Sequence, residues 1–218
     1  HYTVGRIPGD RPRPSRHSGP ASVRVGAGEG TQCALRDHAV QAGCTAVVVF
    51  RVGDTLYCGN AGDSRAVLCR GNGEVHAMSE DHKPTSITEL SRIEGAGGFV
   101  NANGRVNANL NLSRSLGDMK YKQVPKMLPK DQMITAEPDI TVTQVHPDDR
   151  FFVIACDGVW DVLGNQEICD FVSARLDKGM DVEAIVRDVF THCVADDPRK
   201  TQGIGGDNMT CMIVLLNQ

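Results

Sequence analysis

The stretch FFVIACDGVWDV, residues 151–162, joins a run of apolar residues to two carboxylates. The five consecutive apolar residues 151–155 are too few to span a membrane, and such a run is typical of a strand buried on both faces. Asp157 and Asp161 follow it closely, with Gly158 between them. A carboxylate at the end of a buried strand is unfavourable unless a cation or several hydrogen-bond donors meet it. The stretch therefore predicts a candidate metal site, with a polar turn and a capped helix as the alternative.

Length and composition indicate one domain with a sizeable core, because the chain has 218 residues of which 40% are hydrophobic. Its 23 glycines and 5% aromatic residues indicate many turns and a β-rich or mixed fold. A formal net charge of -4 gives no sign of a nucleic-acid partner. No apolar stretch approaches about 18 residues, so we expect no membrane partner and no signal peptide.

The eight cysteines contain no C-x-x-C pair, and several lie inside strand-like apolar runs. A reduced cysteine in such a run behaves as a small buried hydrophobe. We therefore expect neither a disulfide framework nor a structural zinc site, and we expect a reducing compartment, the cytoplasm or nucleus. The chain begins with His1 rather than Met, which suggests a fragment or a processed product.

The first 42 residues differ in composition from the rest. Residues 1–30 are rich in Gly, Pro, Arg and Ser and cannot bury enough surface to offset their ordering entropy, whereas 31–42 could form a short helix. We therefore expect a low-complexity, disordered extension over 1–42 and a folded domain over 43–218.

Strand patterns dominate the folded domain. Expected strands or hairpins fall at 45–52, 55–59, 64–70, 75–78, 99–106, 140–145, 151–155 and 208–216, and expected helices at 85–96, 165–176 and 182–194. Residues 110–135 are expected to form a long, partly irregular connection. Since hairpin connections imply antiparallel pairing, the prediction is an α+β fold, a layered α-β-β-α sandwich of two antiparallel sheets flanked by helices.

Four carboxylates are the leading candidates for chemistry. Asp157, Asp161 and Asp207 each lie close to an apolar strand and a Gly, and Asp63 has the same arrangement in GDSR. Oxygen ligands of this kind suit Mg²⁺ or Mn²⁺ rather than zinc, and such a cation can activate water for attack on a phosphoryl or acyl centre. The sequence contains no Ser-His-Asp elbow, no phosphate-cradling glycine loop and no zincin helix.

Eight motifs occur in order from about residue 43 to the end of the chain. They are GCTA (43–46), NAGDSRAVL (60–68), DHKP (81–84), RV (105–106), LSRSLGD (112–118), EPD (137–139), ACDGVWDV (155–162) and GDNMT (206–210). Together they resemble the metal-dependent protein phosphatase 2C family. The resemblance implies two antiparallel sheets flanked by helices and a Mg²⁺- or Mn²⁺-dependent hydrolase that acts on phosphoserine and phosphothreonine in phosphoprotein substrates.

The resemblance also implies roles for the four carboxylates. Asp157 and Asp207 match ligands of the family's binuclear metal centre, and Asp63 and Asp161 match carboxylates of a third, weaker metal position. For Asp63, a turn carboxylate that caps neighbouring N–H groups is the alternative.

Three further residues are interpreted as structural. His82 is expected to be a hydrogen-bonding residue rather than an acid or ligand, and Arg114 a structural cation. Trp160, the only tryptophan, is expected in the core beneath the site.

One part of the family pattern has no match. Nothing in residues 1–42 resembles the family's acidic N-terminal segment or its Asp-Gly-His-Gly type motif, which supplies the carboxylate that bridges the two metals. The chain is therefore expected to be the C-terminal two-thirds or so of a phosphatase domain. The leading hypothesis is a protein serine/threonine phosphatase, the alternative is a catalytically inactive phosphatase-like binding module, and a hydrolase of small phosphoesters is a third possibility.

Overall fold

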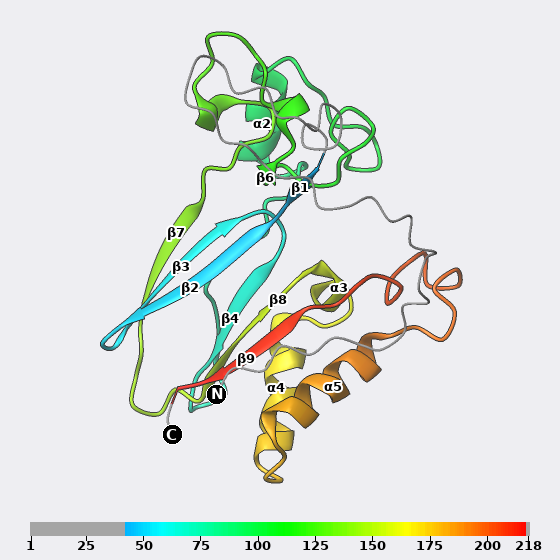
Figure 1. The fold of residues 1–218 in the computed structure, drawn as a ribbon. Coiled ribbons are helices and arrows are strands. Elements are labelled where there is room, and N and C mark those ends of the chain that lie inside the picture. The colour runs from blue at the N-terminus through cyan, green and yellow to red at the C-terminus, as the bar shows by residue number, and fades with distance from the viewer. Residues whose placement is uncertain (1–41, 217–218) are drawn as a thin grey trace, which may run out of the picture.

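The computed structural model describes residues 42–216, in which every pair of named strands is antiparallel (Figure 1). The four-stranded sheet has the order β5-β4-β8-β9, with β4 at Arg65–Cys69, β5 at Val75–Ala77, β8 at Phe151–Ala155 and β9 at Cys211–Leu215. The three-stranded sheet has the order β2-β3-β7, with β2 at Ala46–Val52, β3 at Thr55–Ala61 and β7 at Asp139–Gln144. A short pair joins β1, Gly43–Cys44, to β6, Leu116–Gly117.

Strand β8 is buried on both faces, as its continuous apolar run predicts. Phe151, Val153 and Ala155 point into the core shared with the helices, whereas Phe152 and Ile154 point into the core between the two sheets. This alternation follows from the two-residue repeat of a strand. The strand therefore ties the helical layer to both sheets.

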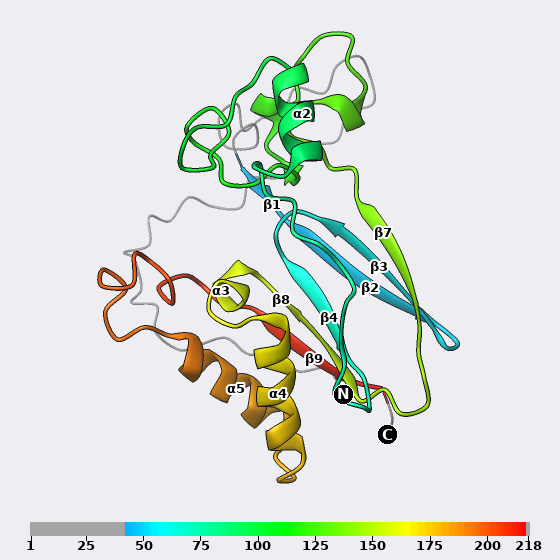
Figure 2. The same ribbon diagram turned by 180° about the vertical axis from the view of Figure 1, so that it is seen from behind.

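Helices cover the outer face of the four-stranded sheet. They are α4, Asn165–Leu176, and α5, Val182–Cys193, which lie side by side along this sheet (Figure 2). They contribute apolar side chains to the core that they share with the sheet, among them Ile168, Val172, Ile185 and Val189. Asp181 caps α5 by accepting a hydrogen bond from the N–H of Glu183 at 3.0 Å. The expected helices at 165–176 and 182–194 are thus confirmed to within one residue. No helix in residues 42–216 is long and apolar enough to cross a membrane.

The outer face of the three-stranded sheet is open within the described residues. Val48, Phe50, Ile140 and Val142 on this face are 62%, 64%, 61% and 58% exposed. The α+β class and the two stacked antiparallel sheets flanked by helices are confirmed, and within residues 42–216 α4 and α5 cover the outer face of the four-stranded sheet.

Between β5 and β7 the chain forms a separate lobe, residues 84–138, at one end of the sheets (Figure 1). It contains α2 (Ile87–Gly95) and the 3₁₀ turns η1 (Met119–Tyr121) and η2 (Pro129–Asp131). Its own small core consists of Ile93, Ala96, Val106, Tyr121, Met133 and Ile134. The expected helix at 85–96 and the irregular connection at 110–135 are both present.

The hairpin predicted at 99–106 forms its turn but not its strands. Its pairing is limited to the bridge between Val100 and Val106, with backbone hydrogen bonds from Asn101 to Arg105 at 3.0 Å and from Asn107 to Phe99 at 2.9 Å. In the turn, the Asn101 side chain accepts hydrogen bonds from the N–H groups of Asn103 and Arg105. The predicted extension and helix before residue 42 lie outside the described residues.

Candidate metal centre

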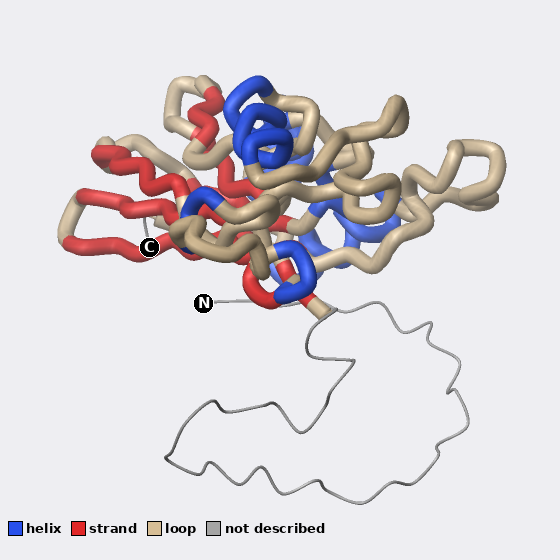
Figure 3. The backbone as a smooth tube through the Cα atoms, turned by 90° about the horizontal axis from the view of Figure 1, so that it is seen from above, coloured by secondary structure: helices blue, strands red, loops and turns tan. Residues whose placement is uncertain are grey.

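The four-stranded sheet brings the predicted carboxylates to one end. Arg65 of β4 pairs with Ala155 of β8, and Ala155 pairs with Cys211 of β9. Asp63 precedes β4, Asp157 follows β8 and Asp207 precedes β9, so the antiparallel register places all three at the same end. Figure 3 looks down on the molecule from above, where loops lie over the strands.

The four carboxylates interact through their charges. Burial raises the pKa of Asp157, and the negative charges of Asp63, Asp207 and Asp161 raise it further. Burial also raises the pKa of Asp161, an effect that Lys83 opposes and that Asp63 and Asp207 reinforce. Carboxylates that repel one another in this way are stabilised by a cation.

The helix start that carries Asp157 packs against the loop that carries Asp207. Asp157 opens the short helix α3, Asp157–Trp160, and its Oδ1 accepts a hydrogen bond from the N–H of Gly158 at 2.9 Å. A Cβ on Gly158 would lie 2.4 Å from the carbonyl oxygen of Asn208, so only glycine allows this approach. Cys156 fixes the same loop, since its N–H donates to the carbonyl of Thr210 at 3.1 Å.

Asp63 lies in a cluster of charges that the sequence did not reveal. Its side chain is buried, and its Oδ2 lies 3.2 Å from Nζ of Lys83. Lys83 also lies 3.7 Å from Asp81, which Arg65 binds with two hydrogen bonds of 2.8 Å each. The partner of the Asp63 carboxylate is therefore the Lys83 ammonium group. The alternative role, capping of turn N–H groups, is not the one observed. The DHKP motif was a possible signal, because it places a lysine and an acid within reach of this loop.

Trp160 lies in the core beneath the carboxylates, as predicted. It is 6% exposed, and its Nε1–H donates to the carbonyl oxygens of Ala155 at 2.8 Å and Arg65 at 3.2 Å. The Arg65 guanidinium stacks over the ring at 5.1 Å. Trp160 thus holds the end of β8 to the start of β4.

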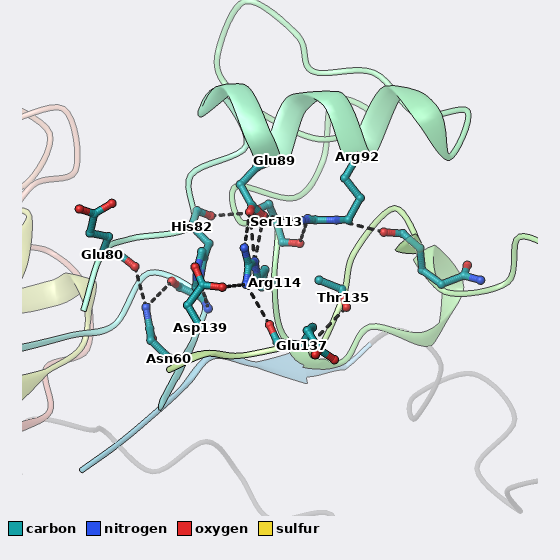
Figure 4. A network of polar contacts seen from close by, with 12 residues as sticks. Asn60, Glu80, His82, Glu89, Arg92, Ser113, Arg114, Thr135, Glu137 and Asp139 are labelled. Carbon is teal, nitrogen blue, oxygen red and sulfur yellow. Dashed lines mark hydrogen bonds and ion pairs between the residues drawn. The ribbon is translucent and has the colours of Figure 1, made fainter. Parts of the chain in front are cut away.

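A buried ion-pair network ties the lobe together (Figure 4). Glu89 on α2 accepts hydrogen bonds from Arg114 at 2.7 Å, Arg92 at 2.7 Å and Ser113 at 2.6 Å. Burial alone would raise the pKa of Glu89, but these bonds outweigh it and lower the pKa to about 2. Arg114 is therefore structural, in agreement with its interpretation from the sequence.

The network continues to the Asp63 loop through His82. Arg114 donates to Asp139 at 2.7 Å, and the other oxygen of Asp139 lies 3.0 Å from Nε2 of His82. Nδ1 of His82 accepts from the N–H of Gly62 at 3.1 Å, so Nε2 carries the proton and donates it to Asp139. Both ring nitrogens are thus occupied by protein groups, and His82 is a hydrogen-bonding residue as predicted.

A second acidic group, at residues 146–149, has its possible ligand atoms closer together than the predicted carboxylates do. Among residues 42–216, the ligand atoms of His146, Asp148 and Asp149 lie within 4.8 Å of one another, whereas the four predicted carboxylates form no such tight group. Arg70 already occupies that other group, because it binds Asp149 at 2.9 Å and contacts Nδ1 of His146 at 3.2 Å. The segment from His146 to Asp149 is therefore a turn closed by the Arg70–Asp149 ion pair.

The chemistry of the predicted donors fits a hard divalent cation. Asp157, Asp207, Asp63 and Asp161 offer only oxygen, the ligand that Mg²⁺ and Mn²⁺ prefer. Two of them, Asp161 and Asp207, are exposed at the surface and accessible to a cation from solvent. The site is thus an open carboxylate group whose members stand further apart than in a closed metal cage.

Solved structures with this fold include phosphatases. The chain is similar to the crystal structure of a phosphatase from a pathogenic strain of Toxoplasma gondii, with a TM-score of 0.65 and 32% sequence identity over 75% of this chain and 48% of that one. The fold and the carboxylate end of the sheet together therefore place the chain in a class of phosphatase-like proteins.

The family follows from the sequence comparison. Residues 27–201 match the model of the protein phosphatase 2C family, and the chain belongs to that family. It is 46% identical over 181 residues to protein phosphatase 2C homolog 3 of Schizosaccharomyces pombe, covering 83% of this chain and 43% of that protein. It is also 46% identical over 181 residues to protein phosphatase 2C 1 of Paramecium tetraurelia, covering 59% of that protein. The chain thus spans about half the length of the curated relatives it matches.

Proposed function

We propose that the chain is part of a metal-dependent protein serine/threonine phosphatase. In this proposal Asp157 and Asp207 hold two Mg²⁺ or Mn²⁺ ions, and Asp63 and Asp161 form a third, weaker cation position. The observation that carries the proposal is the convergence of these carboxylates at one end of the four-stranded sheet. Membership of the protein phosphatase 2C family supports the reaction class.

The residues of the chain position the cations. Divalent cations, when bound, would neutralise charge on a phosphoryl group and activate water for in-line attack. The N–H of Gly158 fixes one oxygen of Asp157, so the other points away from it and remains free to act as a ligand. Asp207 accepts from the N–H of Asn208 at 2.7 Å, which orients its carboxylate in the same manner. Both side chains are therefore partly preorganised for ligation.

Hydrolysis of a phosphothreonine peptide by the 218-residue chain, with and without Mn²⁺, tests the proposal. If the centre assembles in this chain without the family's N-terminal carboxylate, Mn²⁺-dependent release of phosphate should fall at least about a hundredfold in Asp157→Asn and in Asp207→Asn, because each loses a charged ligand. Asp54→Asn is the matched control, since Asp54 is exposed in the β2–β3 turn of the three-stranded sheet. Equal activity in all four proteins would contradict the assignment of the ligands.

The same assay separates the other two hypotheses. A folded chain that binds the phosphopeptide and releases no phosphate with Mn²⁺ present would favour an inactive phosphatase-like binding module. Turnover of p-nitrophenyl phosphate without turnover of phosphopeptides would favour a hydrolase of small phosphoesters.

A further inference from the structure

Lys83 lies at the Asp63 side of the carboxylate group. Its Nζ is 3.2 Å from Oδ2 of Asp63 and 3.7 Å from Oδ2 of Asp81, and it also interacts electrostatically with Asp161. We propose that Lys83 is an internal cation that occupies the Asp63–Asp161 position and competes with a divalent cation for it. This inference rests on the proposed function, because it concerns the regulation of the same carboxylates.

The ion pair is not an ordinary surface contact. The Asp63 side chain is 4% exposed, so its charge requires a counter-ion, whereas the Lys83 side chain is 40% exposed. The ammonium group can therefore swing into solvent while the carboxylate stays in place. A cation arriving from solvent would then replace it as the counter-ion of Asp63.

The backbone on either side holds Lys83 at this position. The N–H of His82 donates to the carbonyl of Gly62 at 3.0 Å, and Nδ1 of His82 accepts from the N–H of Gly62. Asn60 donates to the carbonyl of Glu80 at 2.8 Å. The segment before Lys83 is thus fixed to the loop that carries Asp63, and the lysine stem starts beside its partner. Most exposed ion pairs lack this preorganisation.

Competition follows from simple electrostatics. An ammonium and a divalent cation on the same carboxylate repel each other strongly at separations of a few ångströms. The apparent affinity for the divalent cation then equals the intrinsic affinity multiplied by the fraction of molecules in which Lys83 has moved away. The weakness of this third position is therefore a property of Lys83 as well as of the carboxylates.

Titration of the 218-residue chain with Mn²⁺, followed by the electron paramagnetic resonance signal of free Mn²⁺, tests the inference. In Lys83→Met we expect the dissociation constant of the weakest Mn²⁺ to fall on the order of tenfold, a typical coupling between two sites. Lys83→Arg keeps the charge and should resemble the unmodified chain. Lys178→Met, at an exposed position in the α4–α5 turn, controls for the lost surface charge.

A double-mutant cycle with Asp63→Asn isolates the pair. The gain in affinity from Lys83→Met should vanish when Asp63→Asn is also present. Thermal melting in EDTA and in Mn²⁺ gives a second measurement, because Lys83→Met leaves the buried Asp63 without its partner. The melting temperature of Lys83→Met should therefore rise more on adding Mn²⁺ than that of the unmodified chain.

The outcomes separate this inference from the proposed function. If the chain binds Mn²⁺ and loses it in Asp157→Asn, but Lys83→Met binds no tighter and gains no larger melting shift, the role of Lys83 is wrong and the metal centre stands. If Mn²⁺ binding is absent or indifferent to Asp157→Asn, the metal centre fails and the role of Lys83 fails with it.

Discussion

Replacing Glu89 by Gln is expected to lower the free energy of unfolding by about 3 kcal/mol at pH 7. The pKa of this carboxyl is about 2 in the folded chain, against an ordinary value of 4.5. Each unit of difference between the pKa in the folded and unfolded states corresponds to about 1.4 kcal/mol of stability, which gives about 3 kcal/mol for Glu89. An independent figure agrees, because removing one partner of a buried ion pair costs about 3–5 kcal/mol, and Arg114 is 8% exposed.

The contribution of Glu89 should depend on pH in a defined direction. Because the pKa is lower in the folded state, the stabilisation is fully present above pH 4.5 and disappears as the pH falls toward 2. Urea unfolding of both proteins, followed by far-UV circular dichroism at pH 7 and pH 3, measures this directly. The difference between them at pH 3 should be less than about half of the difference at pH 7.

Glu94→Gln provides the matched control, because Glu94 is exposed on the same helix. Its stability should stay within about 0.5 kcal/mol of the unmodified chain at both pH values. A Glu89→Gln protein as stable as this control, or a stability difference that stays constant from pH 7 to pH 3, would refute the account of the network.

Gly158→Ala should weaken Mn²⁺ binding about tenfold or more, because its Cβ would force the Asn208 loop and the carboxylate before it to move. Gly95→Ala, where a Cβ meets nothing within 4 Å and the backbone is not left-handed, should leave Mn²⁺ affinity unchanged in the same titration, and equal effects at both glycines would count against the packing argument. Phe50→Thr combined with Ile140→Thr should reduce self-association of the chain in light scattering, because the two side chains are 64% and 61% exposed on the open sheet face. The melting temperature of this double variant should change by only a few degrees. Undiminished association would show that copies of the chain do not associate through this sheet face.

Strands and helices were predictable from the sequence where their apolar residues follow one clear repeat. The alternation of β7, the apolar run of β8 and the spacing of apolar residues in α4 and α5 predicted the bounds of these elements to within one or two residues. The lobe was different, since Glu89 and Arg114 are 25 residues apart in sequence and no local pattern links them. Long-range ion pairs of this kind determine its shape, so periodicity could indicate only that the connection was irregular.

The carboxylates of the candidate site were predictable from the sequence, but the lysine that contacts them was not. A carboxylate next to an apolar strand and a glycine is visible in the sequence, and antiparallel pairing then brings Asp63, Asp157 and Asp207 together. The contact between Lys83 and Asp63 depends on how the segment after β5 is hydrogen-bonded to the β3–β4 loop. Side-chain contacts across such a loop leave no repeating pattern in the sequence. The assignment of the four carboxylates to individual metals remains a prediction.

The contact between His82 and Asp139 has a consequence for how such a protein can diverge. The chain leaves the sandwich at His82 and returns at Asp139, and these two side chains meet at 3.0 Å. The two ends of the lobe are therefore clamped together, and β6 and Arg114 inside it contact β1 and Asp139. The turn at residues 102–104 takes part in none of these contacts. The entropy of closing a loop grows only slowly with its length, so insertions and deletions there cost little stability. Evolution can thus change the length of this turn while the strands that carry the carboxylates stay unchanged.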